Sequence, residues 1–190
     1  MMVLPRLAQL VLVVETNDVK KTDDRYYSWI LRNFFEKYVK PDVENNLKIV
    51  FHFVHIDGWG NYNKKMTNDQ IRSYQRSFCS GPTFVLFCMD HDNRKKETAK
   101  RIQAIVEHCT SKGYFLSVAY PEIENVVFPN RGGRNKAEAS AYFASHQPKR
   151  DSVTQANLFA DSKSVLEKPG RTTFGTVVAE IIRALESGVK

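Results

Sequence analysis

At residues 9–15 the chain reads QLVLVVE, an unbroken run of mostly aliphatic residues that ends in a carboxylate. The pattern returns at residues 83–92, TFVLFCMDHD, where a second apolar run ends at Asp90 and Asp92. Continuous apolar runs of this kind are typical of strands that are buried on both faces within a parallel sheet. Both stretches are therefore expected to be inner strands, and each ends in acid.

Helices and strands alternate outward from these two runs. Apolar residues at spacings of three and four predict helices, and runs of β-formers predict two further strands. The expected elements are a helix at 22–39 stopped by Pro41, a strand at 47–56, a helix at 67–78, a helix at 97–112 ended by Gly113, and a strand at 114–121. This alternation predicts an α/β fold with a mainly parallel, Rossmann-like sheet of four or more strands and helices on both faces.

The chain changes character after Pro121. Residues 122–128 (EIENVVF) are short and mixed, residues 130–171 are basic and polar with weak helical stretches, and residues 173–186 predict a clear helix. At 190 residues the chain is expected to form a single domain, 1–190. Its core would lie at about 8–121 and its C-terminal extension at about 122–190.

Composition narrows the setting and the partners. No stretch approaches the ~20 apolar residues that span a bilayer, and the apolar N-terminal run contains Pro5 and Arg6, so it is interpreted as a strand rather than a secretory signal. Three cysteines without paired spacing predict neither a disulfide framework nor a zinc site, which favours a cytoplasmic protein. The net charge of +7 favours an anionic partner, and nucleic acid is the obvious candidate.

The acids at the strand ends are the candidate metal-binding residues. Ligands of open α/β sheets bind outside the carboxyl ends of the strands, so Glu15, Asp90 and Asp92 are expected to converge there. Carboxylate oxygens suit Mg²⁺ or Mn²⁺, and the two aspartates point the same way if their segment stays extended. The alternative is structural, because strand-end aspartates also turn the chain, and Asp92 can cap the helix that follows.

The sequence resembles the Toprim superfamily over roughly residues 8–121. The resemblance rests on LVLVVETND, which supplies the strand-end Glu15, and on FVLFCMDHD, which supplies the DxD of Asp90 and Asp92. Among Toprim proteins, the small OLD-type nucleases are the most similar in layout, and they often carry a further acid after the fourth strand. In PEIENVVF that acid is Glu124, with Glu122 as the other candidate. The family usually has Gly after the first acid, where this chain has Thr16.

The resemblance implies a metal-dependent nuclease that hydrolyses phosphodiester bonds, within a phage-defence or mobile-element system. Glu15, Asp90, Asp92 and Glu124 would hold Mg²⁺ or Mn²⁺, and a basic residue, Lys168 or Lys163, would assist near the scissile phosphate. DNA is favoured over RNA as substrate. Such relatives often work with an ATPase, which would be a separate protein because this chain has no GxxxxGK[ST] loop. A homo-oligomer is left open.

Further residues are candidates for nucleic-acid contact or for packing. Lys64 and Lys65 lie close to Trp59 and Tyr62, and basic residues beside aromatic ones can grip a nucleic acid through charge and stacking. A second basic segment contributes Arg131, Arg134 and Lys136. Solubility explains both groups equally well. The spacing of His52 and His55 puts them on opposite faces of a strand, so each is expected to be packed or hydrogen-bonded rather than a shared metal ligand.

Other protein classes are weighed against the nuclease. A catalytically degenerate Toprim-like binding or assembly module, partnering an ATPase, is favoured by Thr16 in the glycine position. Haloacid-dehalogenase phosphatases use DxDx[TV], but Arg94 occupies the last of these positions. Glycosyltransferases with a DxD are usually longer and would leave Glu15 without a role. The last two classes rank below the module.

Overall fold

A computed structural model describes residues 6–16, 22–35, 47–91, 96–128, 136–146 and 153–186. Within these residues the centre is a five-stranded sheet in the order β2-β1-β3-β4-β5. Its strands are β1 (Arg6–Val14), β2 (Leu47–His55), β3 (Thr83–Asp90), β4 (Phe115–Tyr120) and β5 (Arg171–Thr172). The first four are parallel, whereas β5 pairs antiparallel to β4. The predicted mainly parallel α/β sheet is confirmed, and the short antiparallel strand is an addition to it.

The helices follow the predicted alternation. They are α1 (Thr22–Ile30) with a π-helical turn (Leu31–Phe35), α3 (Lys65–Ser77), α4 (Lys96–Lys112), α5 (Ile123–Val127), α6 (Lys136–Ser145), α7 (Gln155–Leu158) and α8 (Phe174–Glu186). Short 3₁₀ turns cover Trp59–Asn61 and Ser164–Leu166. The helix expected at 22–39 changes to π-helical hydrogen bonding at Leu31, and its last four positions lie outside the described residues.

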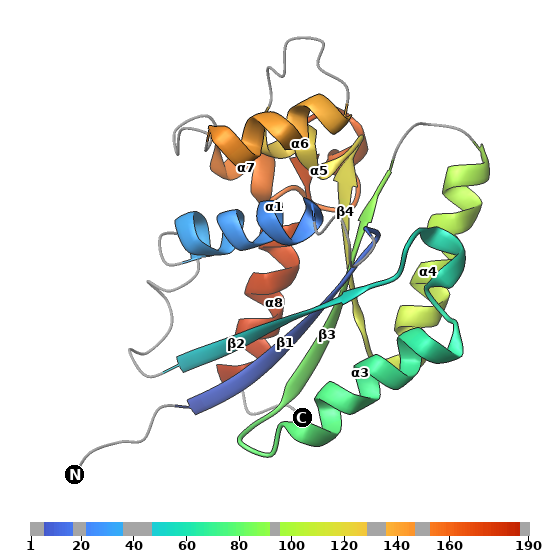
Figure 1. Cartoon of the computed structure of the whole chain (residues 1–190), viewed down its shortest axis with the longest axis vertical. Coiled ribbons are helices and arrows are strands. Elements are labelled where there is room, and N and C mark those ends of the chain that lie inside the picture. The colour runs from blue at the N-terminus through green and yellow to red at the C-terminus, as the bar shows by residue number, and fades with distance from the viewer. Residues whose placement is uncertain are drawn as a thin grey trace.

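The sheet is covered by helices on both faces, as predicted (Figure 1). Alternate residues of β1 serve the two faces, because successive side chains of a strand point in opposite directions. Leu10 and Leu12 belong to the core beneath α1, α5 and α8, while Val11 and Val13 belong to the core beneath α3 and α4. The strand is buried on both sides, which explains its unbroken apolar sequence.

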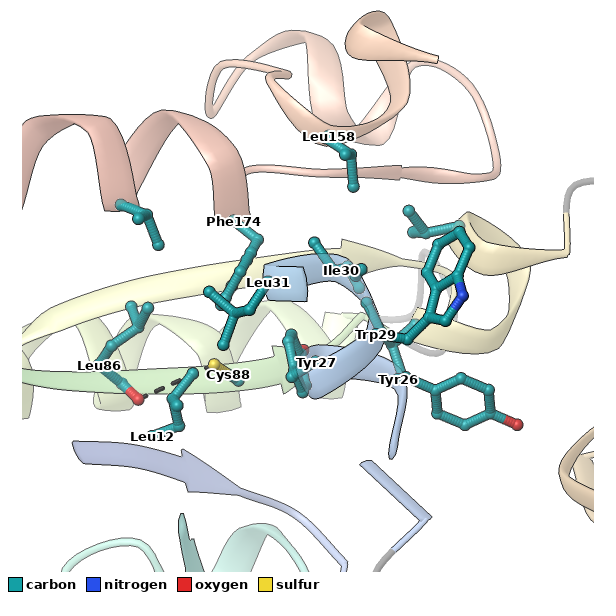
Figure 2. Packing of buried hydrophobic residues seen from close by; sticks show 14 of the residues in the cluster. Leu12, Tyr26, Tyr27, Trp29, Ile30, Leu31, Leu86, Cys88, Leu158 and Phe174 are labelled. Carbon is teal, nitrogen blue, oxygen red and sulfur yellow. Dashed lines mark hydrogen bonds between the residues drawn. The ribbon is translucent and has the colours of Figure 1, made fainter. Parts of the chain in front are cut away.

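The C-terminal extension completes the first of these cores. Figure 2 shows Phe174 of α8 and Tyr27 of α1 in the same packed cluster as Leu12 and Leu86 of the sheet. The rings of Tyr27 and Phe174 are 5.0 Å apart, and those of Tyr26 and Phe143, from α6, are 4.9 Å apart. Aromatic contacts at these distances stabilise the packing beyond the area they bury. Helices α5, α6, α7 and α8 therefore cover the sheet face beside α1.

No helix in the described part of the chain is long and apolar enough to cross a membrane.

The environment of His108 in α4 is expected to make the stability of the fold depend on pH. Its ring lies 5.3 Å from that of Tyr62 and 5.7 Å from that of Phe87, and no hydrogen bond to its Nε2 is found within the described residues. Burial, with a smaller effect from Lys112, lowers the pKa of His108 below its usual 6.5. The folded state disfavours the protonated ring. The contribution of His108 to the free energy of unfolding is therefore complete above the unfolded pKa, and it is lost as pH falls through the lower folded pKa.

We expect His108→Leu to lose less stability on acidification than the wild type. Urea unfolding at about pH 7.5 and about pH 5.5 measures the difference for each protein. His146→Leu is the control, because His146 is exposed and should keep the wild-type response. An unchanged pH response in the His108 variant would show that protonation of this ring does not contribute.

Candidate functional site

The sheet has a topological switch point between β1 and β3. From β1 the chain passes to β2 on one side, and β3 then pairs with β1 on the other. At such a point the connections leave the strand ends in opposite directions, and open α/β sheets bind their ligands there. Glu15 directly follows β1, and Asp90 is the last residue of β3. Two of the predicted acids thus flank the switch point.

Glu15 and Asp90 are brought together directly. The backbone N–H of Asp90 donates to Oε1 of Glu15 over 2.9 Å, although 75 positions separate the two residues. The carboxyl of Asp90 is buried, and its Oδ1 accepts the backbone N–H of Ile123 at the start of α5 over 2.9 Å. The predicted convergence of these two acids at one edge of the sheet is confirmed. Both carboxylates also help to join β1, β3 and α5.

The first turn of α1 adds two carboxylates that the sequence reading did not assign to the site. Oδ2 of Asp23 accepts the backbone N–H of Thr16 over 3.3 Å, and Oδ1 of Asp24 lies 2.8 Å from Nε2 of His55. Asp23 is almost fully buried. The signal in the sequence was a pair of consecutive acids at a helix start, which also fits ordinary capping. These contacts fix the segment that carries Glu15 to α1 and to the end of β2.

Tyr27 lies near the same group of acids. Tyr27 is fully buried in α1, and burial raises the pKa of its hydroxyl, followed by smaller effects of the neighbouring Cys88 and of the negative charges of Asp90, Asp23 and Glu15. Burial also raises the pKa of the Cys88 thiol, then the charge of Asp23 does so, while a hydrogen bond with Tyr27 opposes them. Tyr27 and Cys88 are therefore neutral at physiological pH. Neither side chain is thus ionised as a nucleophile would be.

Glu124 lies in α5 and is completely buried. Glu124 follows Ile123, whose backbone N–H donates to the carboxylate of Asp90. Glu124 is thus the next residue along α5 after this contact. Among the described residues, however, no three His, Cys, Asp or Glu side chains form a group that could hold a metal ion. Glu124 accordingly does not complete a three-ligand set with Glu15 and Asp90. Asp92, the other predicted ligand, lies outside the described residues.

The donors that converge are nevertheless of the right kind for Mg²⁺ or Mn²⁺. Both ions prefer carboxylate oxygens, and Mg²⁺ is commonly held by only one or two carboxylates together with water and substrate phosphates. Glu15 and Asp90 supply two such carboxylates at the switch point, and one oxygen of each accepts a backbone N–H. The residues present thus fit a magnesium-type site with few protein ligands.

The predicted basic residues lie at different places around this edge. Lys64 and Lys65 are exposed where α3 begins, and the loop before them is joined to the site because the N–H of Gly58 donates to the backbone oxygen of Glu15 over 2.8 Å. Lys168 is exposed in the turn before Gly170, whose N–H donates to the oxygen of Tyr120 at the end of β4.

The second basic segment lies largely outside the described residues. Arg131 and Arg134 lie outside the described residues, and the structure describes only the backbone of Lys136, at the start of α6.

The histidines are packed or hydrogen-bonded, as expected. His52 stacks on Tyr74 of α3 with ring centroids 4.5 Å apart, whereas His55 contacts Asp24 of α1. These partners lie on opposite faces of the sheet. His91, directly after β3, is buried and packs edge-to-face against Tyr120.

A scan against protein-family models found no match, and searches of curated proteins and of solved structures found none either.

Proposed function

We propose that this chain is a metal-dependent nuclease that hydrolyses phosphodiester bonds at the carboxyl edge of β1 and β3. The observation that carries the proposal is the contact of the Glu15 carboxylate with Asp90 at the switch point. Strand pairing alone does not require the side chain of Glu15 to contact the backbone N–H of Asp90, 75 positions away, at the edge where an open α/β sheet binds ligands. The Toprim-like pattern of a strand-end Glu followed by a strand-end DxD supports the same function.

In the proposed mechanism, Glu15 and Asp90 would hold the cation, and the Toprim-like pattern adds Asp92, which lies outside the described residues, as a further ligand. When bound, Mg²⁺ or Mn²⁺ orients and activates a water molecule and offsets charge on the leaving oxygen. Asp90 and Asp23 are buried, so water screens their negative charges little and their attraction for a cation is stronger. Lys64, Lys65 and Lys168 supply positive charge around the edge, and Lys168 is the candidate for assisting at the scissile phosphate.

The substrate class follows from the charge of the chain. A net charge of +7 attracts polyanions, and DNA is the proposed substrate, with RNA as the alternative. The proposed setting is a phage-defence or mobile-element system. There the chain is proposed to act with an ATPase, since residues 1–190 contain no phosphate-binding GxxxxGK[ST] loop.

The second candidate is a binding or assembly module that keeps the fold without catalysis. It is favoured because Glu15 and Asp90 both accept backbone hydrogen bonds, so a structural role explains their positions without a metal. Thr16 in the glycine position also favours it.

Cleavage assays separate the two candidates. Plasmid DNA and a structured RNA are incubated with the wild type in Mg²⁺, in Mn²⁺ or in EDTA, and in parallel with the Asp90→Ala, Asp92→Ala double variant. We expect cleavage that requires the metal and is absent from the folded double variant. Cleavage by both proteins would assign the activity to a different site or a contaminant, and no cleavage under any condition would favour the module.

A further inference from the structure

A stripe of basic side chains runs along the solvent-facing side of α3. Lys65, Arg72 and Arg76 are all exposed. An α-helix turns by about 100° and rises about 1.5 Å per residue, which places these three within an arc of about 40° and over about 16 Å of the axis. Asp69 lies in the same stripe, with its Oδ1 3.6 Å from Nη1 of Arg72. We refer to Lys65, Arg72 and Arg76 as the α3 stripe.

The surface beside the stripe is hollowed. Two open hollows of ≈ 440 Å³ and ≈ 600 Å³ are lined by α3 residues, and together they extend from Lys65 to Ser77. They share Asp69 and Ser73 and are therefore adjacent. Both hollows are open to solvent and have cations along them, which suits an extended polyanion better than a small ligand, because small-molecule sites are usually clefts that bury most of the ligand.

The neighbouring helix on the same sheet face provides a contrast. The exposed cations of α4, among them Lys100 and Arg101, are interrupted by the exposed acids Glu97 and Glu107. In α3, Asp69 is the single acid among its thirteen residues. Each helix carries a net charge of +2, from three cations and one acid in α3 and from four cations and two acids in α4, so what distinguishes α3 is that its cations lie along one line.

We propose that the α3 stripe is a phosphate-contacting track that binds the backbone of the nucleic acid on its way from the acid edge. The inference rests on the proposed function for its direction, because α3 begins at the edge that carries Glu15 and ends near the opposite edge, where β3 starts. Arg presents a planar fork of donors that matches phosphate, and phosphate contacts dominate sequence-independent binding.

An anionic membrane is the less suitable partner for the same stripe. Helices that lie in membrane interfaces bury a broad apolar face in lipid. In α3 the apolar Ile71 is buried against the sheet, and Met66 is the one large apolar side chain of the helix that is strongly exposed.

The test is binding of a fluorescein-labelled DNA duplex by anisotropy, in EDTA so that no cleavage occurs. The variant is Arg72→Gln, Arg76→Gln, and the matched control is Lys112→Gln, Arg183→Gln, which removes the same charge from exposed positions of α4 and α8. Each duplex phosphate contact contributes about 0.9 to the slope of log affinity against log salt, so the variant should reduce the slope by about 1.8. At about 0.1 M salt its binding should weaken at least about tenfold, whereas the control stays within about twofold.

Asp69→Asn gives a result of opposite sign. It removes the carboxylate beside Arg72, so we expect tighter binding than the wild type. Equal losses in the variant and the control would overturn the inference, as would absence of DNA binding or binding of anionic phospholipid vesicles in place of DNA. The outcome can be separated from that of the nuclease proposal. If the Arg72→Gln, Arg76→Gln variant loses DNA binding and the wild type does not cleave, the track is retained and the nuclease is rejected. If the wild type cleaves and the variant binds DNA as tightly as the wild type, the nuclease is retained and the track is rejected.

Discussion

Glu15→Gln is expected to lower the rate of metal-dependent cleavage by about a thousandfold or more, equivalent to roughly 4 kcal/mol of transition-state stabilisation. Glutamine has the same shape and keeps a carbonyl oxygen, so it can still accept the N–H of Asp90 that Glu15 now accepts over 2.9 Å. What it removes is the negative charge that a divalent cation needs. The substitution thus separates the ligand role of Glu15 from its structural role.

The control for this experiment is Glu180→Gln, which makes the same chemical change at an exposed position of α8. Plasmid cleavage in Mg²⁺ and in Mn²⁺ gives the rates, and circular dichroism with urea unfolding shows that both variants are folded. If Glu15→Gln is folded and cleaves like the wild type, the acid pair is structural and the proposed site is wrong. A folded, inactive Glu15→Gln beside an active Glu180→Gln would place the chemistry at the switch point.

The part of the site that sequence could predict is the part that strand geometry determines. Unbroken apolar runs identify β1 and β3 as inner parallel strands, and parallel strands bring their carboxyl ends to one edge. Glu15 and Asp90 were therefore expected together, and their contact is observed. Asp23 and Asp24 could not be assigned in this way. Their contacts with Thr16 and His55 depend on how α1 packs over the sheet, which local pattern does not specify.

Contacts between distant parts of the chain also explain why β5 and α5 were not predicted from the sequence. β5 has two residues, too few for any periodicity, and it exists because Arg171 and Thr172 pair with the end of β4. The five-residue helix α5 starts where the carboxylate of Asp90, 33 positions away, accepts the N–H of Ile123. An isolated helix of this length is unstable in water. Both elements depend on contacts between distant parts of the chain, so the local sequence at 122–128 and 171–172 gave only weak signals, in contrast to the clear helical pattern of α8.

Among glycine-to-alanine substitutions in the described loops, Gly81→Ala is expected to produce the largest loss of stability. A Cβ at Gly81 would lie 1.8 Å from the backbone oxygen of Leu7 and 2.8 Å from its carbonyl carbon. Both atoms belong to the backbone of β1, so no side-chain rotation can relieve the overlap. The turn must move away from β1, which weakens the adjacent hydrogen bond from the N–H of Gln9 to the oxygen of Pro82, 2.9 Å in the wild type.

Overpacking of this kind costs about 3 kcal/mol or more, which for a chain of this size lowers Tm by roughly 6–12 °C. Gly60→Ala is the matched control, because nothing lies within 4 Å of its Cβ position and its φ is not in the left-handed region. It should be neutral or stabilising by up to about 1 kcal/mol, since alanine restricts the unfolded chain. Thermal and urea unfolding of the two variants measure the difference, and equal stabilities would mean that the Ser80–Pro82 turn does not pack against β1 as described. Because Gly81 lies at the edge of the sheet where β3 begins, a destabilised variant that still cleaves with Mg²⁺ would also separate the stability of the sheet from the chemistry at the opposite edge.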